Sequence, residues 1–151
     1  MPIKQAIIWG GLTAGALDIT AACIHSGFYG RSPIWLLQIV AGGLLGRDSS
    51  LQGGLKTAAL GLALHFFIAT TWAAVYCAAS LKLPVLTQQA VISGVLYGIV
   101  VYLFMYAVVR PLSALHLRFF DQTASGIFIA VLIHICCVGL PIALMARRYA
   151  K

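Results

Sequence analysis

Three ionisable residues, Asp18, His65 and His134, lie inside stretches of sequence that are otherwise almost free of charge. Such a side chain inside a membrane helix costs free energy, so it pairs with other polar groups and marks a candidate functional site. Each histidine lies about ten residues, or about 15 Å of helix, beyond the start of its apolar stretch. Asp18 lies about 12 residues into the first stretch, counted from the other side of the membrane. We therefore expect the three side chains at one depth.

Two histidines at one depth could bind a single iron from opposite sides. In an up-and-down arrangement of four helices, the second and fourth helices are parallel and lie diagonally across the bundle. His65 and His134 would then face each other, as the two axial ligands of a haem do. The sequence has no C-x-x-C-H, so the attachment would be non-covalent. We expect His65 and His134 to hold haem b, or a metal ion, for electron transfer.

Glycines and a tyrosine on the other two helices would surround such a cofactor. Gly15 ends a G-x-x-x-G in the first apolar stretch, and Gly98 ends a second one in the third stretch. Glycines leave space for a flat ring, Tyr102 could hydrogen-bond near its edge, and Asp18 could relay a proton. This arrangement resembles that of four-helix membrane cytochromes b. The same glycines also suit direct helix packing, and a purely structural polar network is an alternative.

Two functions of other classes remain open. A single carboxylate in the first span of a four-span chain resembles the small multidrug-resistance transporters, so Asp18 could bind a proton or an ion during transport. That family is shorter and has Glu at this position. The chain could also be an accessory subunit of a membrane complex, with no site of its own. No pattern of catalytic residues predicts an enzyme.

The composition indicates a membrane protein. Of the 151 residues, 62% are hydrophobic and 9% are charged, and the mean hydropathy is +0.99. A soluble domain has about 25% charged residues, so these few charges cannot cover a soluble surface. Apolar stretches at 5–24, 55–80, 89–109 and 123–145 are each long enough to cross a bilayer. We predict an all-α fold, a polytopic four-transmembrane-helix bundle that forms a single integral-membrane domain over residues 1–151.

A fifth apolar stretch, at 34–46, is shorter. As a helix its 13 residues would rise about 20 Å, which is less than the hydrocarbon core of about 30 Å. Ser32 and Pro33 are typical of a helix start. We therefore predict an interfacial or re-entrant helix after the first span. A second short surface helix is expected at 112–122.

The positions of the charged residues and of the cysteines indicate which binding partners to expect. The net charge of +7 comes from basic residues that lie singly at the ends of apolar stretches, where they meet lipid headgroups. The lipid bilayer is therefore the expected partner and nucleic acid is not, while a homo-oligomer or a larger membrane complex remains open. Five basic residues fall on each predicted side, so orientation is undecided. The four cysteines form no C-x-x-C and are expected to serve packing.

Several segments carry a resemblance to a known family. They are A-G-A-L-D at 14–18, S-P at 32–33, L-L-Q-I-V-A-G-G-L-L-G-R-D at 36–48, G-L-A-L-H-F at 61–66 and H-I-C-C-V-G-L-P-I-A at 134–143. Together they resemble a family of short bacterial inner-membrane proteins that has no assigned activity. The resemblance spans nearly the whole chain. It implies a location in the bacterial cytoplasmic membrane and implies no chemistry.

Overall fold

Four long helical segments dominate the computed structural model, which describes residues 2–118 and 122–149. They are α1 (Pro2–Gly27), α4 (Gly54–Lys82), α6 (Ala90–Phe104) with its continuations η1 (Met105–Val109) and α7 (Arg110–Leu112), and α8 (Ala124–Ile133) with its continuations η3 (His134–Gly139) and α9 (Leu140–Tyr149). Each of the four is long and apolar enough to cross a membrane, as in a multi-pass membrane protein. The described residues contain no strand. The predicted all-α class is confirmed, and so are four apolar helices that could span a membrane.

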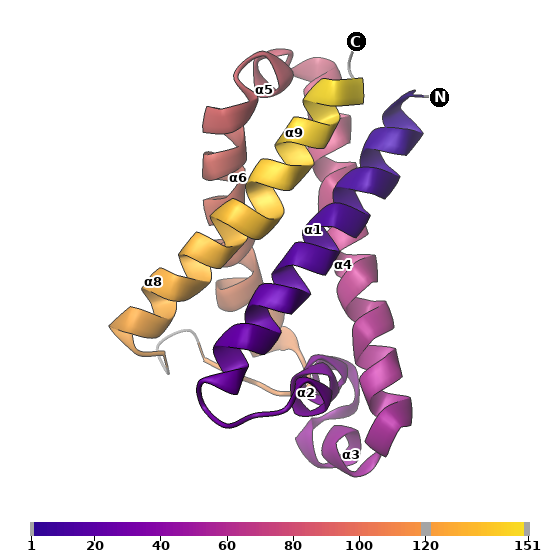
Figure 1. Ribbon diagram of the computed structural model, residues 1–151, viewed down its shortest axis with the longest axis vertical. Coiled ribbons are helices and arrows are strands. Elements are labelled where there is room, and N and C mark those ends of the chain that lie inside the picture. Colours follow the sequence, from indigo (N-terminus) through magenta and orange to yellow (C-terminus); the bar gives the residue numbers. More distant parts are fainter. Residues whose placement is uncertain (1, 119–121, 150–151) are drawn as a thin grey trace.

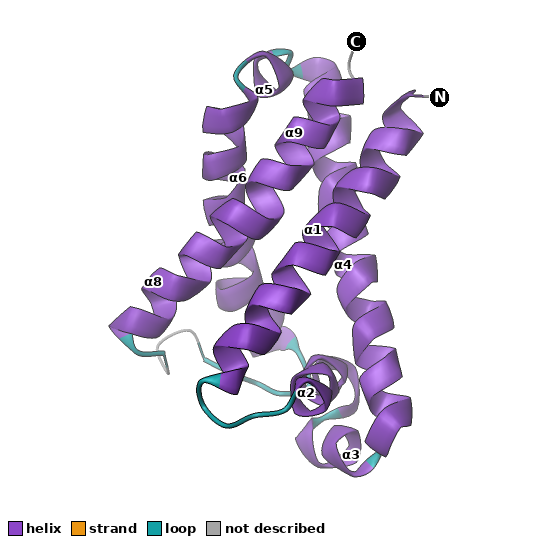
Figure 2. Cartoon of the chain, in the orientation of Figure 1, coloured by secondary structure: helices purple, strands orange, loops and turns teal. Residues whose placement is uncertain are grey.

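The long helices pack side by side in alternating directions. Helix α1 packs against α4 and also against η3 and α9, and α6 packs against η3 and α9. The first turn of α1 and the last turn of α9 lie at the same end of the molecule (Figure 1). Short links join most of the helices, as Figure 2 shows.

Glycines allow two of these helix pairs to come into close contact. A Cβ atom added at Gly98 would lie 2.6 Å from Cα of Ile135, and one at Gly139 would overlap the backbone of Gly94 and Gly98. On the other side of the molecule, a Cβ at Gly15 would lie 2.7 Å from the ring of Phe66. Both G-x-x-x-G motifs therefore bring helices together directly, as small residues do in membranes.

Two π turns interrupt the third and fourth long helices, and each precedes a proline. The N–H of Arg110 bonds the carbonyl of Met105, and the N–H of Leu140 bonds the carbonyl of Ile135. Pro111 and Pro141 follow directly. A proline lacks the N–H for an i−4 bond, and its ring clashes with the i−4 carbonyl. Widening the preceding turn relieves that clash, which explains why each π turn lies where it does.

Helix α2 (Pro33–Leu45) and helix α3 (Arg47–Gln52) lie at the end of the molecule away from the two termini (Figure 1). Oγ of Ser32 accepts a hydrogen bond from the Trp35 N–H at 3.1 Å and caps α2. Helix α2 packs against α4, where Gly61 meets the backbone of Leu37. The side-chain amide of Gln38 donates to the carbonyl of Gly54 at 3.1 Å. These bounds agree with the short helix predicted at 34–46.

The helix predicted at 112–122 is wrong for the described part of that stretch. Helix α7 ends at Leu112, and Ser113 adopts extended backbone with ψ 164°. Oγ of Ser113 donates to the carbonyl of Arg110 at 2.7 Å, and His116 has a φ of 48°. A left-handed residue other than glycine cannot continue a helix. Residues 119–121 of the predicted helix lie outside the described residues. Two short helices, α3 and α5 (Val85–Gln88), were not predicted.

Candidate functional site

One cavity of 130 Å³ between the helices is lined by all three of the ionisable residues that the sequence analysis singled out. Asp18 comes from α1, His65 from α4 and His134 from the start of η3. The remaining walls are mostly apolar, and they include Val40 of α2, Trp72 of α4 and Val101 of α6. Two helices and a π turn thus place polar groups in one largely apolar cavity, and α2 forms part of its wall.

Asp18 and His65 form the closest ionisable pair in the cavity. Oδ2 of Asp18 lies 3.9 Å from Nε2 of His65, and the side chains are 18% and 14% exposed. That separation suits an ion pair and is too long for a hydrogen bond. Nε2 of His65 donates instead to the carbonyl of Gly15 at 2.9 Å. Because a carbonyl can only accept, this nitrogen carries a proton in either charge state of the ring.

His134 is held by its own helix and by two tyrosine rings. Its Nδ1 donates to the carbonyl of Ala130 at 2.8 Å, which leaves Nε2 as the acceptor of the neutral ring. The rings of Tyr102 and Tyr106 lie edge-on to it, with centroid separations of 5.6 Å and 5.9 Å. The imidazole is therefore fixed in orientation.

A row of aromatic and cationic groups leads from the cavity toward the end that carries α2. The rings of Tyr102 and Tyr106 lie 4.5 Å apart, and the Arg110 guanidinium lies 4.4 Å above the Tyr106 ring. Sequence reasoning did not assign Arg110 or Tyr106 to the site. The spacing of four between residues 102, 106 and 110 is the signal that could have found them.

The glycines and Tyr102 lie behind the cavity wall. The ring of Phe66 fills the space beside Gly15, and the backbone of His134 and Ile135 fills the space beside Gly98. Tyr102 is 1% exposed and packs against His134. Neither glycine leaves room at its own position for a flat ring. Gly15 contributes through its carbonyl, which binds His65.

No family model, curated protein or solved structure matches the chain. The resemblance to bacterial inner-membrane proteins and to cytochromes b therefore stays a prediction. Over residues 2–118 and 122–149, no group of three His, Cys, Asp or Glu side chains is arranged to hold a metal ion. What the site offers is one carboxylate, two oriented imidazoles and a small apolar chamber.

Proposed function

We propose that the Asp18–His65 pair binds and releases a proton within the membrane, as the coupling site of a small proton- or ion-coupled transporter. The observation that carries this proposal is the 3.9 Å pair facing a 130 Å³ cavity between apolar helices. An isolated carboxylate in such surroundings is costly, and intramembrane carboxylates with histidine partners mark ion pathways and proton relays. When Asp18 is ionised, a positive charge on His65 lowers the free-energy cost of the buried carboxylate.

The size of the cavity favours a small occupant. A volume of 130 Å³ is below the range of about 300–1,000 Å³ for pockets that hold drug-sized ligands. It leaves room for a few water molecules or one small ion next to Asp18. Tyr106 and Arg110 then supply the polar side of a route toward the end of the molecule at α2.

The arrangement in the membrane is part of the same proposal. The four long helices form a bundle in a bacterial cytoplasmic membrane, and α2 is re-entrant. The contribution of Val40 to the cavity supports this, because α2 must then reach from the end of the molecule to the site. Assembly into a homo-oligomer or a larger complex would supply a partner for apolar side chains such as Phe67, which is 70% exposed.

Infrared titration of the protein in lipid tests the proton site. The sequence has only 3 acidic side chains, Asp18, Asp48 and Asp121, so a protonated-carboxyl band can be assigned with one Asp→Asn variant at each position. We expect one band to disappear in Asp18→Asn and to persist in Asp48→Asn and Asp121→Asn. We also expect its titration midpoint to change in His65→Gln but not in His116→Gln. A band that persists in Asp18→Asn would contradict the proposal. So would a band whose titration midpoint is unchanged in His65→Gln.

Transport is tested separately in proteoliposomes that enclose a pH-sensitive dye. Imposed gradients of candidate cations should drive a proton flux through the wild-type protein, and Asp18→Asn should abolish it. Asp48→Asn serves as the matched control, because Asp48 is an exposed carboxylate on α3. A flux that is equal in both variants would remove Asp18 from the mechanism.

Haem or metal ligation by His65 and His134 is the second candidate, and one observation favours it. The Nδ1 of His134 donates to a backbone carbonyl, as the second nitrogen of a ligating histidine commonly does. The filled space beside Gly15 and Gly98 and the small cavity count against a ring as large as a porphyrin. Reduced-minus-oxidised spectra decide whether haem is bound. Bands lost in His65→Ala and His134→Ala would establish haem, and a colourless protein from haem-sufficient cells would exclude it.

A further inference from the structure

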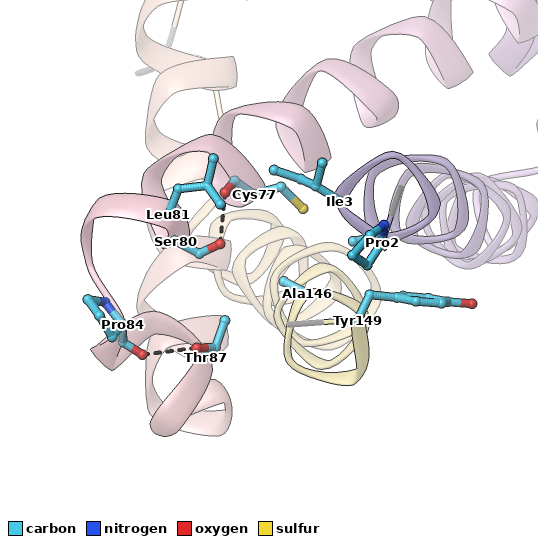
Figure 3. A pocket seen from close by; sticks show the side chains of 10 residues that line it. Pro2, Ile3, Cys77, Ser80, Leu81, Pro84, Thr87, Ala146 and Tyr149 are labelled. Carbon is cyan, nitrogen blue, oxygen red and sulfur yellow. Dashed lines mark hydrogen bonds between the residues drawn. The ribbon is translucent and has the colours of Figure 1, made fainter. Parts of the chain in front are cut away.

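A second cavity, of 360 Å³, lies at the end of the molecule that carries the two termini. Helices α1, α4, α5 and α9 each contribute to its wall. In Figure 3 the sulfur of Cys77 points toward Ile3 of α1, while Pro84 and Thr87 close the opposite side. This volume falls within the range of about 300–1,000 Å³ that is typical of small-molecule sites.

The lining of this cavity is apolar at depth and exposed at its mouth. Ala6, Cys77 and Ala146 are 2–3% exposed and lie deep in it, whereas Leu81 is 71% exposed and forms part of the mouth. Two of the three hydroxyl groups on the wall, those of Ser80 and Thr87, are already engaged as donors, and the third is the phenol of Tyr149. Oγ of Ser80 donates to the carbonyl of Cys77 at 2.8 Å, and Oγ1 of Thr87 donates to the carbonyl of Pro84 at 3.0 Å. The deep part therefore suits a hydrocarbon chain.

Four basic residues lie at this end of the molecule, close to the cavity in sequence. Each is a sequence neighbour of a lining residue: Lys4 follows Ile3, Lys82 follows Leu81, Arg147 follows Ala146, and Arg148 precedes Tyr149. The guanidinium of Arg148 lies 6.0 Å above the Tyr149 ring. All four basic side chains are exposed. Of the described carboxylates, Asp18 is inside the molecule and Asp48 is on α3 at the opposite end, so neither offsets this charge.

We propose that this cavity binds an anionic phospholipid, with an acyl chain in the apolar interior and the phosphate among the basic residues at the mouth. Basic pockets between membrane helices recognise such headgroups, and each cationic side chain adds an electrostatic contribution. An apolar cavity alone would accept any lipid tail. The uncompensated positive charge selects the negative headgroup and fixes the phospholipid at the surface of the bilayer.

The thiol of Cys77 provides a local readout in the whole protein. Cys23, Cys136 and Cys137 are replaced by serine, and the rate of Cys77 alkylation is measured in nanodiscs of phosphatidylcholine with increasing phosphatidylglycerol. We expect phosphatidylglycerol to slow the reaction severalfold. The paired variant Lys82→Gln/Arg148→Gln should lose most of this protection, because each lost charge weakens binding on the order of fivefold. Arg31→Gln/Arg47→Gln, at the opposite end, is the matched control and should keep it.

Each alternative has its own result. Equal rates in both lipids would overturn the proposal, since the headgroup would then have no effect. Protection by inorganic phosphate added to pure phosphatidylcholine nanodiscs would replace the lipid with a soluble anion and would also overturn it. If phosphatidylglycerol still slowed Cys77 alkylation in Lys82→Gln/Arg148→Gln, the basic residues would not be the cause of the protection, and the proposal would be wrong. Circular dichroism of each variant checks that its helix content equals that of the wild type. The comparison of lipids with the wild-type side chains at positions 82 and 148 needs no such control.

Discussion

The carbonyl of Gly15 accepts a hydrogen bond from Nε2 of His65 at 2.9 Å, across the contact between α1 and α4. One turn further along α1, the carboxylate of Asp18 approaches the same nitrogen to 3.9 Å. Helix α1 thus holds the imidazole with its backbone and places a charge beside it. The two interactions have different roles, because the first remains when Asp18 is neutral.

This difference predicts the behaviour of Asp18→Asn. His65 keeps its bond to Gly15, so the free energy of unfolding should fall by less than about 1 kcal/mol, the size of one ordinary hydrogen bond. Proton-coupled flux should nevertheless be lost, because an amide does not titrate. Denaturation in mixed micelles and flux in proteoliposomes measure the two effects separately. Large destabilisation with residual flux would show that Asp18 has a structural role only.

Substitution of Gly98 by alanine should disrupt the contact between α6 and η3. The added Cβ would lie 2.6 Å from Cα of Ile135 and 2.7 Å from the carbonyl oxygen of His134. The backbones must separate, and overpacking of this kind costs about 1–3 kcal/mol. Gly27→Ala is the matched control, since a Cβ there meets nothing within 4 Å. Similar stability of the two variants would mean that α6 and η3 adjust without cost.

Pro141→Ala should shift the orientation of His134. The new N–H at position 141 can bond the carbonyl of Cys137, which allows the π turn to close into an α-turn. The part of the helix before the turn would then rotate by about 100° relative to the part after it. Magic-angle-spinning NMR of ring-labelled histidine can follow this, because the sequence has only 4 histidines. We expect the chemical shift of His134 to change, because its ring would leave the contact with the rings of Tyr102 and Tyr106.

The control for that experiment is Pro33→Ala. Pro33 begins α2, where the missing N–H breaks no intrahelical bond. Its replacement should leave all four histidine signals in place. An unchanged His134 signal in Pro141→Ala would show that tertiary packing, rather than the proline, maintains the π turn.

Cysteine labelling tests whether α2 re-enters the membrane or crosses it. In a background with serine at the native cysteine positions, single cysteines are placed at Ser49, Ser113 and Gln88. The N–H of Ala114 donates to the carbonyl of Gly43 at 2.9 Å, so the end of α7 lies beside α2. A membrane-impermeant maleimide should therefore reach Ser49→Cys and Ser113→Cys from one side and Gln88→Cys from the other. Labelling of Ser49→Cys together with Gln88→Cys would mean that α2 crosses the bilayer.

The sequence predicted the four long helices and α2, because such helices are defined by the length of their apolar stretches. It was wrong for the described part of 112–122 and did not predict the short, more polar helices α3 and α5. Counting residues along a helix led us to expect Asp18, His65 and His134 at one depth, and the three side chains line one cavity. Counting does not give the rotation of each helix about its axis. Contacts such as Gly15 with His65, and Gly98 with Ile135, depend on that rotation and could not be derived from spacing.

The π turns were the least predictable feature. Pro111 and Pro141 are visible in the sequence, but a proline near the end of a helix can end it, kink it or widen the turn before it. Packing chooses among these outcomes. Helix α7 ends at Leu112, one residue after Pro111, whereas α9 continues to Tyr149 beyond Pro141 and packs against α1 and α6.

The π turn at His134–Gly139 divides the fourth long helix into two helical wheels. The wheels are offset by one residue, so His134 and Ile142 cannot be drawn on one regular projection. Closing this π turn without removing a residue would turn one half of the helix by about 100° relative to the other, toward the wrong neighbours. Deleting one residue between 135 and 138 at the same time would cancel that rotation, because the wider turn accommodates one extra residue. Any design that grafts this helix onto another scaffold must therefore keep the extra residue and the π turn together, or remove both, to keep His134 at the cavity.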